Sequence, residues 1–510
     1  MISGLRMAAS KAVIAIGILV ALDWFAAGLA RAQQSHDGTS HDGTSRDGTS
    51  PDATSQDRVW CENRQRAFAP DMRINGCTAM IESGNLTRSD LAVSHNNRGT
   101  AYQEKRDLEH AITDYDEAIK LHPAYAPAYN NRGNAHQAKG DIDAAIADYS
   151  EAIRFDFNFV QAFNNRGKAY QIKGDIDHAL ADYNAAIKLN PDFALAFVNH
   201  GDASLIKGDL NRAIADYSEG IALDPRSAAA FNNRGTAYGR KGDFDHALPD
   251  FDQAIRLDPT YAAAFRNRGL SYQRKDDIDH ALMDYNEAVR LDPKDAENFT
   301  SRGSAVQAEG DLDGALKDYN EAIRLDPKYA GAFQSRGDVQ EAKGEFEAAI
   351  ADYSEAIRIS PESPNGYRAR GFANFYAAKY GAAAADLAHA VADKPADAYP
   401  ALWLYLARTR SGDQGAAAAE LAANARRLTA SDWPYAVVEL FLGERTPEAT
   451  LAAPAKPDER CEAEFYIGEW QLLRADRPAA VESLKTAAST CPKDFVEATD
   501  AQAELKRLGQ

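Results

Sequence analysis

The stretch AYNNRGNAHQAKGDIDAAIADYSEA, residues 128–152, decides the fold, because its parts recur along the middle of the chain. The word NNRG, at 130–133 here, returns at 96–99, 164–167 and 232–235. Its final glycine recurs at a constant interval of 34 residues, at 99, 133, 167, 201, 235, 269, 303, 337 and 371. A fixed period of this length indicates a solenoid of stacked supersecondary units.

Each period has the pattern of two helices joined by a turn. We number the repeats so that the recurring glycine is position 8, and the first full repeat is then 92–125. Position 4 is nearly always aromatic and position 11 is often tyrosine, so positions 4, 8 and 11 share one face of a helix. A Lys-Gly-Asp turn follows, as at 139–141, and Ala145, Tyr149 and Ala152 mark one face of a second helix. A closing proline ends most of the second helices.

Small residues explain how the two helices pack. Glycine at position 8 and alanine at position 20, such as Gly133 and Ala145, allow a close crossing, and larger residues at positions 4, 11 and 24 fill the space around it. This pattern resembles the tetratricopeptide repeat over nine full repeats, 92–397. The resemblance implies an all-α, right-handed superhelical solenoid whose first helices line a concave groove. The departures are mild, such as Phe157 in place of one closing proline.

Amide side chains recur beside the packing face of each predicted first helix. On a helical wheel, positions 5 and 12 flank that face and point away from the second helix. The resemblance implies that this side lines the groove. The candidate groove residues are Asn96, Asn97, Asn130, Asn131, Asn164, Asn165, Asn199, Asn232, Asn233, Asn267, Gln103, Gln137 and Gln171.

Two interpretations of these amides remain open. A primary amide both donates and accepts, as a peptide bond does, so a ladder of amides can hold an extended chain without reading its side chains. Alternatively, the asparagines start or hydrate the helices, or bridge neighbouring repeats. The ladder fades at Ser301, Ser335 and Ala369, so we expect any binding to favour the first six repeats.

Charged residues recur with the same period. Position 7 is arginine in most repeats, with His200 as the exception, and position 23 is always aspartate. The matching periods predict an Arg–Asp pair that ties the two helices together, in preference to a phosphate or carboxylate site. Histidines at position 19, such as His110 and His178, occur once per repeat, too far apart to share a metal, so we expect them to be solvated and predict no metal site.

The N-terminus has the layout of a secretory signal peptide over residues 1–32. Arg6 and Lys11 precede an apolar run at 12–22, and Ala30-Arg31-Ala32 forms a cleavage motif. We therefore expect export across the inner membrane, most simply to the periplasm. The alternative is an uncleaved anchor, which would be the only contact with a membrane. Residues 33–57 contain tandem small, polar pentapeptides and are predicted to be a flexible linker.

Degenerate helical segments flank the array at 58–91 and 398–510. Four cysteines allow three pairings, and an even number in an exported chain suggests disulfides. Cys61 and Cys77 fall at positions 4 and 20 of the leading segment, which face each other across a helix pair. Cys461 begins one helix and Cys491 ends its antiparallel partner. We therefore predict the local pairs Cys61–Cys77 and Cys461–Cys491, and a capping helix at about 495–508.

A second resemblance concerns the C-terminal segment. The words ALWLYLA (401–407), WPYAVVELFLG (433–443), TPEATL (446–451) and FYIGEWQLL (465–473) are similar to the C-terminal half of the NlpI family of periplasmic lipoproteins. The resemblance implies an envelope adaptor that gathers murein hydrolases and a processing protease on a helical scaffold. This chain lacks the lipidation cysteine of that family, so only the class of role is carried over.

Composition and motifs narrow the function classes. The formal charge of −19 argues against a nucleic-acid partner. No nucleophile elbow, zinc-protease, Walker or dinucleotide motif is present, so we expect neither catalysis nor a cofactor. We predict a scaffold that binds other proteins or extended peptides, with homodimerisation possible. The alternative is a structural strut of an envelope, polysaccharide or outer-membrane machine.

Overall fold

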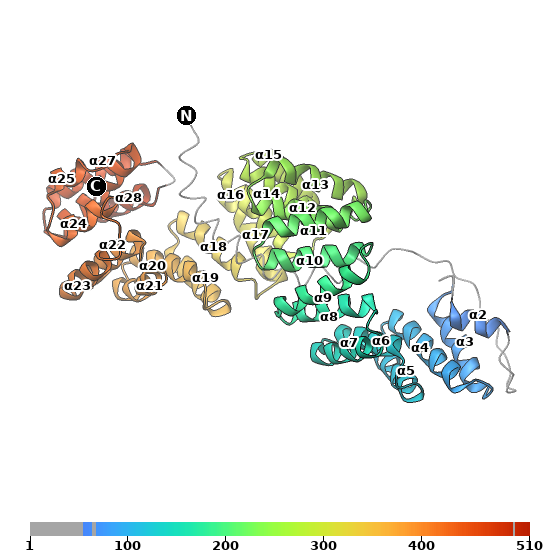
Figure 1. Cartoon of the computed structure of the whole chain (residues 1–510). Helices are drawn as coiled ribbons and strands as arrows, with labels where there is room; N and C mark the ends of the chain where they lie inside the picture. The colour runs from blue at the N-terminus through green and yellow to red at the C-terminus, as the bar shows by residue number, and fades with distance from the viewer. Residues whose placement is uncertain (1–54, 64–67, 493–494) are drawn as a thin grey trace. The chain divides into compact units, whose positions relative to one another are not determined.

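A computed structural model describes residues 55–63, 68–492 and 495–510 of the chain (Figure 1). Within these ranges all regular structure is helical, and the expected all-α repeat solenoid is confirmed. The predicted leader, 1–32, and most of the predicted linker lie outside the described residues. Residues 55–57, assigned to the linker from the sequence, are already helical, because Ser55 and Asp57 suit the first turn of a helix.

The chain divides into two units, 26–271 and 272–510, with the division inside helix α14. The helices described in the first unit are α2 (Ser55–Glu62), α3 (Pro70–Glu82), α4 (Arg88–Glu104), α5 (Leu108–Leu121), α6 (Ala126–Lys139), α7 (Ile142–Phe155), α8 (Val160–Ile172), α9 (Ile176–Leu189), α10 (Ala194–Ile206), α11 (Leu210–Leu223), α12 (Ala228–Arg240), α13 (Phe244–Leu257) and α14 (Ala262–Arg274). From α4 to α20 the even-numbered helices are the first helices of the repeats, and α22 and α26 are the first helices of the pairs α22–α23 and α26–α27.

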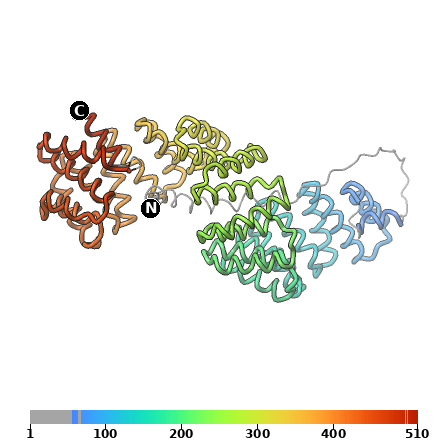
Figure 2. The backbone as a smooth tube through the Cα atoms, turned by 90° about the horizontal axis from the view of Figure 1, so that it is seen from above, coloured from blue at the N-terminus to red at the C-terminus, as the bar shows by residue number. Residues whose placement is uncertain are grey.

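The second unit continues the same alternation and then becomes irregular. Its helices are α15 (Ile278–Leu291), α16 (Ala296–Ala308), α17 (Leu312–Leu325), α18 (Ala330–Ala342), α19 (Phe346–Ile359), α20 (Pro364–Tyr376), α21 (Tyr380–Asp393), α22 (Ala398–Arg410), α23 (Gln414–Ala425), α24 (Tyr435–Leu442), α25 (Pro447–Leu451), α26 (Pro457–Leu473), α27 (Arg477–Thr490) and α28 (Val496–Arg507). Figure 2 traces the same course as a tube.

The turn inside each repeat follows from two residues. Gly140 ends α6 in the left-handed conformation, with φ of 87°, which glycine adopts without a steric penalty. Asp141 then caps α7, because its carboxylate accepts a hydrogen bond of 3.2 Å from the backbone nitrogen of Ala144. The Lys-Gly-Asp words therefore encode both the end of one helix and the start of the next.

The position-8 glycine permits the close crossing that its period predicted. A Cβ added to Gly133 would lie 2.7 Å from Cε1 of Tyr149, so the ring at position 24 fills the space that a side chain would need. Tyr149 is fully buried with Ala145 of its own repeat and Ala169 of the next. This cluster therefore spans two repeats, as expected of a solenoid.

First helices of successive repeats lie closer together than second helices do. In the first unit α6 contacts α8, and in the second α18 contacts α20, whereas the described second helices do not contact their counterparts to the same extent. Within each unit the first helices therefore form the inner side of the stack. We call the side of a first helix that carries positions 5, 6, 9, 12 and 13 the first-helix face.

Both ends of the described chain are cross-linked. Cys61 and Cys77 form a disulfide between α2 and α3, with an S–S distance of 2.13 Å, and Cys461 joins Cys491 with an S–S distance of 2.19 Å. Around the second disulfide, Trp403, Phe465 and Tyr466 belong to one large buried cluster. Among the described residues, no helix is both long enough and apolar enough to cross a membrane.

Candidate binding face on the first helices

The predicted asparagine ladder lies on the first-helix face of the first unit, where its members bond to one another. Asn131 donates from Nδ2 to Oδ1 of Asn96 at 3.0 Å, and Asn165 donates to Asn130 at 3.1 Å. The further links of this kind join Asn199 to Asn164 at 2.8 Å and Asn267 to Asn232 at 2.9 Å. In every case position 6 of one repeat donates to position 5 of the repeat before it.

The asparagines that accept these hydrogen bonds are buried. Asn164 is only 2% exposed, and Asn96, Asn130 and Asn232 are also buried. Asn97 lies half-buried at the start of the ladder and accepts a 3.4 Å bond from Asn96. These contacts fit the alternative in which the asparagines bridge neighbouring repeats. A ligand that used these amides would have to break bonds that hold the stack together.

The ladder changes partner where its pattern is interrupted. Val198 replaces asparagine at position 5, and Asn233 instead donates to Oδ1 of Asp202, at position 9, over 2.9 Å. The same oxygen accepts a 2.7 Å bond from the phenol of Tyr217. Burial raises the pKa of Asp202 to about 7, although these two bonds and the ammonium of Lys168 oppose the rise. This buried acid was not singled out from the sequence.

The glutamines at position 12 differ from the asparagines. Gln103 accepts a 2.8 Å hydrogen bond at Oε1 from the buried phenol of Tyr115. Gln137 and Gln171 accept in the same way from Tyr149 and Tyr183, at 3.2 and 3.0 Å. The tyrosine fixes each amide with its oxygen inward, and among the described residues the three amide nitrogens have no protein partner. Three successive half-buried donors therefore remain on this face.

The predicted pairing of arginine with aspartate is confirmed. Arg166 donates from Nε and from Nη2 to the two oxygens of Asp182, both at 2.8 Å, and its Nη1 reaches Oγ of Ser150 in the preceding second helix at 3.0 Å. Each such arginine thus ties three helices together. Two-bond pairs of the same kind join Arg98 to Asp114, Arg132 to Asp148, Arg234 to Asp250, Arg302 to Asp318, Arg336 to Asp352 and Arg370 to Asp386.

The position-19 histidines are exposed and serve the turns. Nδ1 of His178 lies 2.7 Å from Oδ2 of Asp175, the cap of its own helix, and its ring stacks on Tyr170. His110, His246 and His280 repeat this arrangement. Across the part of the chain that the structure describes, no group of three or more histidine, cysteine, aspartate or glutamate side chains is arranged to hold a metal.

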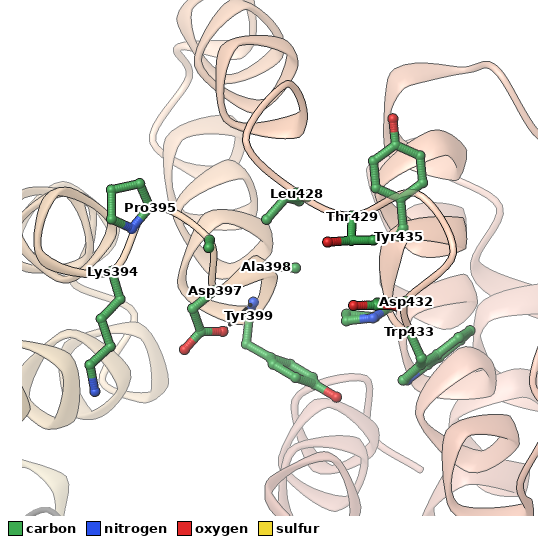
Figure 3. Close-up of a pocket in the computed structure, with 12 residues that line it drawn as sticks. Lys394, Pro395, Asp397, Ala398, Tyr399, Leu428, Thr429, Asp432, Trp433 and Tyr435 are labelled. Carbon is green, nitrogen blue, oxygen red and sulfur yellow. Dashed lines mark hydrogen bonds between the residues drawn. The ribbon is translucent and has the colours of Figure 1, made fainter.

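A pocket of about 530 Å³ lies in the second unit, between the start of α22 and segment 428–435 (Figure 3). Tyr399 donates to Oε2 of Glu462 at 2.8 Å, and Trp433 donates to the same oxygen at 2.7 Å. Figure 3 shows Thr429 and Asp432 across the pocket from Ala398. The sequence does not predict this pocket, because Tyr399 and Trp433 are placed by their contacts with Glu462 on α26, far along the chain.

The geometry defines a helical-repeat solenoid that presents one polar face on its first helices. Family comparisons identify it more closely. Models described as tetratricopeptide repeat match 126–159, 160–193, 228–261 and 263–295, and a TPR repeat model matches 99–140, 201–242, 307–344 and 341–376. The chain belongs to the tetratricopeptide repeat family.

Solved structures show local similarity of the same kind. A tetratricopeptide repeat protein from Parabacteroides merdae is 18% identical with a TM-score of 0.43, covering 49% of this chain and 98% of its own. MamA is 27% identical with a TM-score of 0.30, covering 32% and 95%. YrrB, a TPR protein with an unusual peptide-binding site, is 26% identical with a TM-score of 0.31, covering 37% and 95%. No curated protein matches the chain.

Proposed function

We propose that this chain is a non-catalytic scaffold that binds other proteins or extended peptide segments on the first-helix face of its first unit. Tetratricopeptide repeats support a protein-binding scaffold or adaptor role. The observation that carries the location of the site is the row of unpartnered amide nitrogens at Gln103, Gln137 and Gln171. Backbone carbonyls of an extended peptide are the natural acceptors for such donors.

The partners of the glutamine oxygens make this row well suited to binding. Each oxygen is held by a buried tyrosine, so the amide nitrogen is oriented before a ligand arrives. Pre-ordered side chains lose less conformational entropy on binding than free ones do. The asparagines contribute by holding the repeats, and therefore the glutamines, in register.

A role in the cell envelope is the second element of the proposal. Both disulfides are local and buried, as suits a protein of an oxidising compartment such as the periplasm. In this setting the scaffold would organise envelope hydrolases or proteases, as the similarity of 399–510 to the NlpI family implies. The alternative, a structural strut of an envelope or polysaccharide machine, would use the second helices or the C-terminal segment instead.

The test is a crosslinking pull-down that compares the native chain with a triple variant, Gln103→Glu, Gln137→Glu and Gln171→Glu. Glutamate keeps the acceptor for the tyrosine but removes the donors. The chain itself shows that this geometry is tolerated, because Glu341, also at position 12, accepts a 2.7 Å bond from the phenol of Tyr353. Gln307→Glu, which changes the equivalent contact in the second unit, is the matched control.

We expect partners recovered with the native chain and with Gln307→Glu to be lost from the triple variant. Recovery of the same partners by all three proteins would overturn the assignment of the binding face to these glutamines. Identification of the partners as envelope hydrolases or proteases would support the adaptor role.

A further inference from the structure

The C-terminal helix α28 covers the first-helix face of the last helix pairs. It packs on α27 and α26 as the first helix of a further repeat would. It also reaches much further back along the chain, because Glu504 on α28 accepts a 2.7 Å bond from Nη1 of Arg410 on α22. Arg507 donates to the backbone carbonyl of Tyr376, at the end of α20. The helix therefore contacts α20, α22 and α26 at once.

The charged contacts of α28 form one chain of bonds. Arg410 donates from Nη2 to Glu469 on α26 at 2.6 Å and from Nη1 to Glu504. Arg507 donates to Glu504 over 2.5 Å as well as to the Tyr376 carbonyl. Glu504 thus lies between two guanidinium groups, one from the face and one from its own helix. With these contacts the site can select a helix by the positions of its charged residues as well as by its shape.

The surface that α28 buries is unusual for a permanent cap. Its small residues Ala498 and Ala501 are buried, but so are the acidic side chains Glu497, Asp500 and Glu504. Asp500 is 2% exposed, and neither of its oxygens has a hydrogen-bond partner. A helix that only sealed the core would gain more from apolar residues at these sites, because an unpaired buried carboxyl is costly.

We propose that the first-helix face formed by α20, α22 and α26 is a helix-binding site that α28 occupies in cis, and that an external amphipathic helix displaces it. This site is separate from the glutamine row in the first unit. The resident helix defines what fits. Small residues at 498 and 501 allow close approach, a glutamate at 504 reaches Arg410, and an arginine at 507 reaches the carbonyls that end α20. The expected partner is an amphipathic helix whose contact residues recur every three positions, as they do at 498, 501, 504 and 507.

The buried acids make the occupancy sensitive to pH. Asp500 faces the phenol of Tyr376 on α20, Glu341 on α18, Glu469 on α26 and Glu497 on its own helix. Burial raises the pKa of Asp500 well above its usual range, and the surrounding carboxyls add to the rise, while Tyr376 opposes it. The guanidinium groups of Arg410 and Arg507 lie beside Glu469 and Glu504.

Two further carboxyls on or against α28 behave in the same way. Burial raises the pKa of Glu497, beside Glu462 and Tyr466, to about 8, and that of Glu469 to about 7. The docked helix and its site therefore hold protons that are released above about pH 4 when α28 is free. Its docking weakens as the pH rises from there towards 8, by up to about tenfold per pH unit for each proton held.

The experiment uses the full chain and a fluorescent peptide of residues 495–510 that carries Asp500→Asn. This peptide docks without holding the extra proton, so it competes better with α28 as the pH rises. It is titrated to millimolar concentration, because a tethered helix has an effective concentration of that order. We expect saturable binding that is tighter at pH 8.5 than at pH 5.5. A peptide that also carries Glu504→Ala should bind at least tenfold more weakly, and one that carries Lys506→Gln should bind as before.

A full chain carrying Asp500→Asn separates displacement from general loosening. In this variant the docking of α28 is no longer weakened by Asp500 as the pH rises. The peptide should therefore bind the variant chain more weakly than it binds the native chain at pH 8.5. Glu482→Gln, on the exposed side of α27, is the control and should behave as the native chain. Hydrogen exchange of 496–507, corrected for the intrinsic rate, should accelerate with pH relative to α27 in the native chain and less so in Asp500→Asn.

Absence of saturable binding at both pH values, or equal binding to the native and Asp500→Asn chains, would overturn the proposal and make α28 a fixed cap. This result is distinguishable from failure of the proposed function, because the glutamine variants lie in the other unit and are read out by partner recovery.

Discussion

The side-chain nitrogen of Asn131 donates to the side-chain oxygen of Asn96, 3.0 Å away in the preceding repeat. The bond joins two first helices that share no turn and no salt bridge of their own. Its counterparts recur through the first unit, so the most repetitive word of the sequence encodes the register between repeats.

Removing these amides should lower stability without removing a partner. Asn131→Ala and Asn165→Ala each leave a buried oxygen on the preceding repeat without its donor, and we expect each to lower the free energy of unfolding by about 1–2 kcal/mol. Urea unfolding followed by circular dichroism gives the value, with the half-buried Asn97→Ala as the control. Loss of partner recovery with unchanged stability would instead assign the asparagines to binding.

Each position-7 arginine connects three helices, so its removal should lower stability more than removal of an asparagine does. Arg166→Ala leaves the carboxylate of Asp182 buried and unpaired, and we expect a loss of about 3 kcal/mol. Arg154→Ala removes an exposed ion pair with Glu151 three residues away and should change stability by less than about 0.5 kcal/mol. Denaturant unfolding of both variants measures the difference. Equal effects would show that the period of the arginines has no structural meaning.

The buried acid at position 202 should make the first unit less stable as the pH rises. The pKa of Asp202 is raised from 3.8 to about 7 in the folded chain, so the folded state holds a proton that the unfolded state releases. The contribution of Asp202 to stability is therefore greatest below about pH 4 and falls until about pH 7, by up to about 1.4 kcal/mol per pH unit.

Asp202→Asn should flatten this part of the stability profile, measured by urea unfolding from pH 4 to pH 8. Asp143→Asn, which removes an exposed carboxylate paired with Lys173, is the control and should leave the slope as it is. A native profile that rises over this range would contradict the assignment.

The helix crossing depends on the missing side chain at position 8. Gly133→Ala places a methyl group 2.7 Å from the ring of Tyr149, and we expect a loss of about 2 kcal/mol as the ring moves. Gly381→Ala is the contrasting change, because a Cβ there meets no atom within 4 Å, and it should be neutral or stabilising. Thermal unfolding of the two variants tests the difference, and destabilisation by both would point to backbone effects instead of packing.

Much of the fold could be predicted because it repeats. The 34-residue period, the glycine of the crossing and the pairing of Arg166 with Asp182 all follow from residues that recur in phase within one helix pair. The partners of Asn131 and Asn165 could not be derived, because they depend on the rotation between repeats, which a helical wheel of one repeat does not contain.

Single departures from the period were harder to interpret. Asp202 acquires its environment from Val198, which breaks the ladder, and from Tyr217 and Asn233 on other helices. The pocket beside Trp433 and the position of α28 both need contacts between segments far apart in the C-terminal region. No local pattern carries that information, although the clustering of buried acids in 497–504 marks the segment as unusual.

His200 stands where the neighbouring repeats carry arginine. Its imidazole reaches Asp216 at 2.7 Å, but within the described chain nothing links it to Asn184, the residue of the preceding second helix that an arginine would contact. The junction of α9 and α10 therefore lacks the side-chain hydrogen bond to the preceding second helix that an arginine makes in the neighbouring repeats. We therefore expect this junction to separate before its neighbours when the stack is stretched.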